Sequence, residues 1–77
     1  MPHFMMPSPI QVRMARMLLG IKRSELAKLS GVSERAIGNY EAGATKLIRL
    51  NHEAVRKTLE KLGVEFLDDD GVKRKQD

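Results

Sequence analysis

The 77-residue sequence contains no cysteine and no tryptophan, and aromatic residues make up only 4% of it. Without cysteine the chain can form neither disulfides nor thiolate metal sites, which fits a reducing compartment. So few aromatic rings argue against the stacking platforms that bind RNA or single-stranded nucleic acid. No apolar run approaches the roughly 18 residues of a membrane-spanning helix, and the start of the chain lacks the basic and apolar regions of a signal peptide. We therefore expect a cytoplasmic protein.

Catalytic and metal-binding patterns are also missing. His3 and His52 are far apart and have no acidic partner at ligand spacing, so we expect no metal site. The stretch Asp68–Gly71 suggests a calcium loop, but matching Gly71 to the loop glycine puts Phe66 at the first ligand position. The sequence shows no nucleophile and base at a recognisable spacing and no glycine loop for a phosphate. We expect neither an enzyme nor a cofactor.

The charge of the chain is positive: 14 Lys and Arg against 10 Asp and Glu give a net charge of +4 and a pI near 9.8. An excess of positive charge favours the binding of polyanions, including nucleic acid. Membrane surfaces also attract basic chains, but the apolar helix faces are needed to pack against one another, so we expect no membrane partner. A chain this short buries only about 60% of its unfolded surface, and dimerisation would help to stabilise it.

A first helix is predicted from Pro9 to about Leu19. Ser8 can cap it, Pro9 suits its first position, Gln11 completes a capping box and Gly20 ends it. Its apolar residues form one stripe, which we expect to face the core: Ile10, Met14, Met17 and Leu18. Gln11, Arg13 and Arg16 lie elsewhere on this helix.

Residues 22–43 are predicted to form two short helices joined by a tight turn. Gly31 can adopt a positive φ and end the first helix, Ser33 can cap the second, and Glu34 suits the positive end of its dipole. The inner faces carry small and apolar side chains: Leu26, Ala27, Leu29 and Ser30 on the first helix, and Ala36, Ile37 and Tyr40 on the second. The small Ala27 permits the close approach that a helix-turn-helix requires.

Several matches at fixed spacing carry a family resemblance: Leu26-Ala27, Gly31-Val32-Ser33, Ile37 and Tyr40-Glu41-Ala42-Gly43. Together they resemble the Cro/repressor-type (XRE-like) helix-turn-helix family over roughly residues 9–67. The resemblance implies an all-α, lambda-repressor-like domain of four short helices that acts as a sequence-specific transcriptional regulator, and we expect a repressor. Two positions depart from the family: Lys22 replaces the usual Ser or Thr cap, and Arg23 replaces the usual Gln.

By the same resemblance, helix 33–41 enters the major groove. Its outer face carries the candidate base-contacting residues, which are Glu34, Arg35, Gly38 and Asn39. The chemistry agrees, because Arg pairs with guanine O6 and N7 and Asn with adenine N6 and N7. The alternative is a merely solvated face, but glycine costs about 1 kcal/mol relative to alanine inside a helix, and Gly38 can allow close approach to the groove. Glu34 can accept from cytosine N4, orient Arg35 or cap the helix.

Phosphate contacts should position such a domain on the duplex. The candidates are Arg23, Ser33, Thr45, Lys46, Arg13 and Lys22. Arg23 and Lys46 are the strongest of them, at the start of one helix and in the loop Ala44–Leu50. The resemblance also implies a structural ion pair between Arg16 and Glu41, which would tie the first helix to the end of the recognition helix.

A fourth helix is predicted between an Asn51 cap and Gly63, with Val55, Leu59 and Leu62 facing inward. Val64–Leu67, an Asp-Asp-Asp-Gly turn and Val72–Lys75 then suggest a weak β-hairpin. A lone hairpin is marginal in water, so it must dock on the fourth helix or pair across a subunit interface, which makes it a candidate dimerisation element. The alternative is a frayed charged tail after Leu67.

The expected organisation is a flexible arm over residues 1–7, in which Phe4 and Met5 can pack back onto the domain, a DNA-binding domain over 8–63 and a β extension over 64–77. The expected partners are double-stranded DNA on the nucleoid and a second copy of the chain. A rival hypothesis from another class is an antitoxin-like or adaptor module whose main partner is a protein, such as a toxin or an effector.

Overall fold

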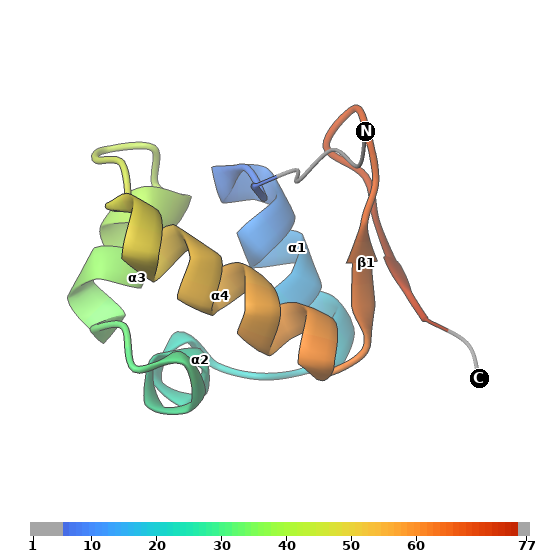
Figure 1. Ribbon diagram of the computed structural model, residues 1–77, viewed down its shortest axis with the longest axis horizontal. Coiled ribbons are helices and arrows are strands. Elements are labelled where there is room, and N and C mark those ends of the chain that lie inside the picture. The colour runs from blue at the N-terminus through green and yellow to red at the C-terminus, as the bar shows by residue number, and fades with distance from the viewer. Residues whose placement is uncertain (1–5, 76–77) are drawn as a thin grey trace.

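The computed structural model describes residues 6–75, which form four helices followed by two strands (Figure 1). The elements are α1 Pro9–Leu19, α2 Arg23–Ser30, α3 Glu34–Glu41, α4 Arg49–Lys61, β1 Val64–Phe66 and β2 Val72–Arg74. In Figure 1, α3 and the hairpin of β1 and β2 lie on opposite sides of α1 and α4. The expectations for residues 1–5, including His3, Phe4 and Met5, lie outside the described residues.

The predicted boundaries of α1 and α2 are confirmed. Ser8 Oγ accepts from the Gln11 N–H at 3.2 Å, and Gln11 Oε1 accepts from the Ser8 N–H at 2.9 Å, which is the capping box. Gly20 and Gly31 follow the two helices with φ of 69° and 77°, the left-handed conformation that glycine adopts without strain. A few adjacent residues therefore fix these ends.

The predicted start of the fourth helix is wrong, because α4 begins at Arg49, before Asn51. Ile48 is the N-cap residue and makes no side-chain cap hydrogen bond; its carbonyl accepts from the His52 N–H at 2.9 Å. Leu47 packs against the core just before this turn. Packing of the partly buried Leu47 against the core, rather than a polar cap, accompanies the entry of the chain into α4.

The core draws residues from all four helices, the α2–α3 turn and the first strand: Val12, Ala15, Leu26, Val32, Ile37, Tyr40, Val55, Leu59 and Val64. The predicted inward stripe of α1 is wrong: Ile10 is 56% and Met17 70% exposed, and Met14 and Leu18 are exposed too. Val12 and Ala15 are buried instead. Their small side chains let neighbouring elements approach α1 closely, and the larger apolar residues remain on its outer side.

Two further inward assignments are wrong, since Leu29 of α2 and Leu62 at the end of α4 are exposed. Each lies one helical turn beyond a fully buried leucine, Leu26 or Leu59, near a helix end. The described elements do not cover either leucine, at the end of α2 or at the end of α4.

The hairpin is confirmed, and the frayed-tail alternative is wrong. The antiparallel strands pair Val64 with Arg74, Glu65 with Lys73 and Phe66 with Val72. Val64 is buried, and Phe66 and Val72 pack against the core. Burial of these side chains supplies the stability that an isolated hairpin lacks.

Gln11 anchors the hairpin turn to α1. Its Nε2 donates to the Leu67 carbonyl at 2.8 Å and to the Gly71 carbonyl at 2.9 Å. Its placement away from the inward face of α1 is wrong, since the residue is only 2% exposed. A buried amide is stable here because both its oxygen and its nitrogen have partners.

Candidate nucleic-acid interface

The α2–α3 unit is a two-helix corner around a tight turn. Leu26 of α2 and Ile37 of α3 are fully buried where the helices pack, and Val32 in the turn joins them in the core. Ser33 caps α3 with its Oγ accepting from the Ala36 N–H at 3.1 Å. The inner face of α3 is thus fixed against the domain, and its other face is left to solvent.

Lys22 is the N-cap residue of α2, and its side chain makes no cap hydrogen bond. The Glu25 carboxylate, one turn further on, accepts from the Lys22 N–H at 3.0 Å. A carboxylate at this end also suits the helix dipole. The Glu25 side chain therefore provides one cap hydrogen bond at the start of α2, where the Lys22 side chain provides none.

The outer face of α3 carries all four candidate base-contacting residues. Glu34, Arg35 and Asn39 are exposed and Gly38 is half-buried, and the four line one open hollow together with Arg23 of α2. Among the ion pairs of residues 6–75 there is none between Glu34 and Arg35, so the structure does not favour an orienting role for Glu34. Both side chains present their charges to solvent.

The fifth member of this hollow, Arg23, was expected at a phosphate. Its guanidinium lies over α3 at Gly38, where a Cβ would stand only 2.7 Å from Arg23 Nη1. The missing side chain of Gly38 therefore leaves the space that Arg23 occupies. Sequence reasoning could not find this contact because it joins two helices across the corner.

The other candidate phosphate contacts are all exposed. Lys22 and Ser33 are at the starts of α2 and α3, Thr45 and Lys46 are in the loop before α4, and all four are exposed. The Ser33 oxygen already accepts one bond, but its O–H remains a donor. Thr45 and Lys46 line a second hollow, beside the end of α3. Arg13 is exposed on α1, outside both hollows.

A bidentate ion pair holds the end of α3 on α1. Arg16 Nε and Nη2 each donate to a Glu41 carboxylate oxygen at 2.7 Å, and Arg16 Nη1 donates to the Ile21 carbonyl at 3.2 Å. The Arg16 side chain is 14% and that of Glu41 6% exposed. The hydrogen bonds to Glu41 raise the pKa of Arg16 above its usual value, although burial opposes them. One guanidinium therefore joins α1, α3 and the segment before α2.

Sequence reasoning missed a polar cluster around the Pro7 carbonyl. The Tyr40 hydroxyl donates to that oxygen at 2.7 Å, while His52 Nε2 lies 2.7 Å from it and 3.0 Å from the hydroxyl. Pro7 itself, which the sequence places in the arm, is buried. Burial raises the pKa of Tyr40. The cluster fastens the segment before α1 to the C-terminal end of α3 and the N-terminal end of α4, and His52 makes a structural contact there.

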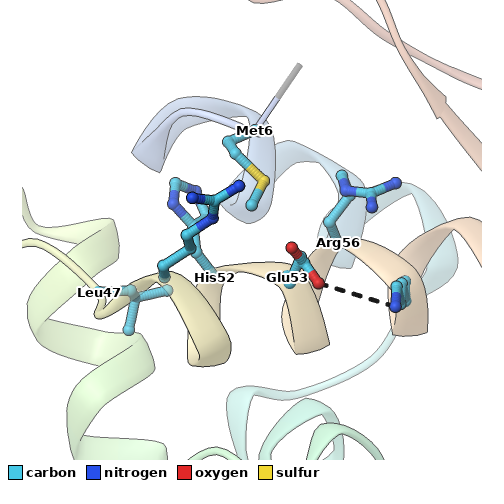
Figure 2. A pocket seen from close by; sticks show the side chains of 7 residues that line it. Met6, Leu47, His52, Glu53 and Arg56 are labelled. Carbon is cyan, nitrogen blue, oxygen red and sulfur yellow. Dashed lines mark ion pairs between the residues drawn. The ribbon is translucent and has the colours of Figure 1, made fainter. Parts of the chain in front are cut away.

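Figure 2 shows a separate pocket beside α4, with Met6 above the helix and His52, Glu53 and Arg56 along it. Its charged groups are largely paired on the same helix: Lys57 Nζ lies 3.7 Å from Glu53, and Arg56 lies 2.8 Å from Glu60. Nothing among these groups pairs a nucleophile with a base. Within residues 6–75 no group of three or more His, Cys, Asp or Glu side chains could hold a metal ion, and no helix is long and apolar enough to cross a membrane.

A short helix, a glycine turn and a second helix, capped by Ser33, with one buried and one polar face form a helix-turn-helix, a motif found in DNA-binding proteins. A family model described as helix-turn-helix matches residues 12–67. The chain belongs to the Cro/repressor-type (XRE-like) helix-turn-helix family, a family of non-enzymatic domains that bind double-stranded DNA, and its fold is the all-α, lambda-repressor-like one. A comparison with curated proteins found no significant match.

Proposed function

We propose that the protein is a sequence-specific transcriptional repressor that reads the major groove with α3. The observation that carries this proposal is the gathering of Glu34, Arg35, Gly38 and Asn39 around one exposed hollow on a helix whose opposite face is buried. In this proposal Arg35 pairs with a guanine and Asn39 with an adenine. Repression needs only that the bound domain cover a promoter.

Positive charge around the same face supports duplex DNA as the ligand. Lys22 and Arg23 are exposed at the start of α2 and Lys46 in the loop between α3 and α4, and Arg13 is an exposed charge on α1. The logarithm of the binding constant falls with the logarithm of the salt concentration, with a slope of about −0.9 for each neutralised phosphate. A rise in salt from about 50 to 200 mM therefore lowers the affinity by about 3.5-fold for each such contact. A steep salt dependence is therefore expected. A location on the nucleoid, in the cytoplasm, follows from this ligand.

We further propose a homodimer that reads two half-sites about one helical turn apart. The supporting observation is the exposed apolar stripe on α1, formed by Ile10, Met14, Met17 and Leu18, on the helix to which Gln11 fastens the hairpin. The stripe and the hairpin are the candidate dimer face. The chain has a mass of 8.7 kDa, and light scattering of the wild type should give twice this mass. The Met17→Lys variant should give the mass of a monomer. A wild-type protein that binds DNA as a monomer would contradict the proposed dimer.

The same stripe also favours a second function, that of an antitoxin-like or adaptor module whose main partner is a protein. An exposed apolar patch is a common site of protein association. The two functions differ in what the polar face of α3 does. In the adaptor, alanine at Arg35 and Asn39 leaves partner binding intact and duplex DNA binds weakly and without sequence preference.

Selection of bound duplexes from a random DNA pool tests the proposed function. We expect an enriched inverted repeat, for which affinity falls steeply with salt. Lys61 is exposed in the last turn of α4, and α4 ends beside β1, on the side of the domain away from α3 (Figure 1). Lys61→Ala therefore provides a control with the same loss of charge as Arg35→Ala. Selection that enriches no common sequence, together with equal binding by Arg35→Ala and Lys61→Ala, would show that α3 does not read DNA.

A further inference from the structure

The side chain of Arg23 extends across the recognition helix. It starts at the first residue of α2, yet its Nη1 lies 2.7 Å from where a Cβ of Gly38 would stand, in the middle of α3. It shares the hollow there with Arg35 and Asn39. The guanidinium is therefore part of the surface that would face the bases, which a contact to a phosphate does not require.

The Arg23 guanidinium also has unused hydrogen-bonding capacity. It is a planar group with five N–H donors, and in the described part of the chain it has neither a hydrogen bond nor an ion pair. The major-groove edge of guanine presents two acceptors, O6 and N7, at the spacing of such a fork. An ammonium group carries the same charge but cannot match that spacing.

Gly38 provides the space for this arrangement. Glycine weakens a helix interior relative to alanine, and any Cβ at position 38 would collide with the end of the Arg23 side chain. That end is flexible, so alanine would displace the guanidinium rather than the backbone. The position of the Arg23 guanidinium therefore depends on the absence of a side chain at position 38.

We propose that Arg23 is a specificity-determining residue that binds the O6 and N7 of one guanine, with Gly38 as the space that admits it. The inference rests on the proposed function, because it requires α3 to enter the major groove. The competing assignment is contact with a phosphate.

Titrations of five proteins test the proposal: wild type, Arg23→Gln, Arg23→Lys, Gly38→Ala and the double variant R23Q/G38A. Each is titrated with the selected duplex and with every single-base-pair change of it, at two salt concentrations. We expect Arg23→Gln and Arg23→Lys to lose about 5- to 150-fold of preference at the same single G·C pair. Arg23→Lys keeps the charge and hence nearly the wild-type salt slope.

Gly38→Ala should lose the preference at that same base pair without a lower Tm, since alanine favours the helix. The double variant should be no worse than Arg23→Gln, because both changes remove one contact. Lys46→Gln is the control for a phosphate contact: it should weaken binding to all duplexes by one factor.

Equal weakening on every duplex by Arg23→Gln, with a salt slope lower by about 0.9 and restored by Arg23→Lys, would establish the phosphate contact and overturn the proposal. Unchanged base preferences in Gly38→Ala would overturn the role given to Gly38. A wild-type protein that prefers no duplex refutes the proposed function instead. A wild type that prefers one duplex, beside an Arg23→Gln variant with every preference intact, refutes only this inference.

Discussion

The ion pair between Arg16 and Glu41 should contribute strongly to the stability of the fold. We consider Arg16→Met, which keeps an apolar stem of similar length but leaves the Glu41 carboxylate, only 6% exposed, without its partner. Removing one member of a buried pair costs about 3 to 5 kcal/mol. Because Arg16 retains 14% exposure, water can partly reach the site, and we expect a loss near the lower end, about 3 kcal/mol.

That loss is large for a domain of this size. Stabilities of about 0.05 to 0.15 kcal/mol per residue leave a chain of 77 residues with little reserve. With about 4 to 8 °C of Tm lost per kcal/mol in domains of 60 to 100 residues, Arg16→Met should lower Tm by about 12 to 24 °C. Urea unfolding followed by circular dichroism gives the free energy of unfolding, and differential scanning calorimetry gives Tm.

Two comparisons separate the burial of an unpaired charge from a general loss of packing. Adding Glu41→Leu to Arg16→Met should restore part of the stability, because the unpaired carboxylate is then gone. Lys57→Ala breaks an exposed pair with Glu53, 3.7 Å apart, and should cost less than about 1 kcal/mol. The reasoning is refuted if Arg16→Met costs no more than Lys57→Ala, or if Glu41→Leu destabilises the Met variant further.

Three other changes have expected outcomes. Ser33→Ala removes the cap of α3 and should cost about 1 kcal/mol in urea unfolding; no change would contradict the cap. Gln11→Leu releases the hairpin turn, so the Leu67 amide should exchange its hydrogen faster while core amides of α4 keep their protection; unaltered exchange at Leu67 would contradict the anchor. Tyr40→Phe loses the bond to Pro7 at a cost of about 1 kcal/mol. Because burial raises the pKa of Tyr40, wild-type stability is complete below about pH 10, the ordinary tyrosine value, and falls above it. The Phe variant should lack this contribution to the alkaline loss, and an identical pH profile would contradict it.

Local signals in the sequence predicted the elements of the fold well. Ser8 and Ser33 cap their helices, and Gly20 and Gly31 end theirs, because a cap or a left-handed residue acts on backbone groups within one turn. The prediction that α4 begins after an Asn51 cap was wrong, because α4 begins at Arg49 and no side chain caps it.

The orientation of α1 could not be predicted from its apolar residues. Arg16 and Gln11 fix it through partners 25 to 60 residues away in the chain, while Met17 remains exposed. The family resemblance was enough to predict which residues lie on the outer face of α3, Glu34, Arg35, Gly38 and Asn39. It did not predict the contact of Arg23 with Gly38, because the path of the long Arg23 side chain across the corner is set by the packed structure.

The central claim is that the outer face of α3 reads base pairs. The most direct measurement is the ratio of the Kd for a scrambled duplex to the Kd for the selected duplex, in wild type, Arg35→Ala, Asn39→Ala and the α4 control Lys61→Ala. We expect the ratio to fall by about 5-fold or more in each α3 variant, from about 1 to 3 kcal/mol per base contact, and to stay unchanged in Lys61→Ala. A ratio that is the same in all four proteins contradicts the claim.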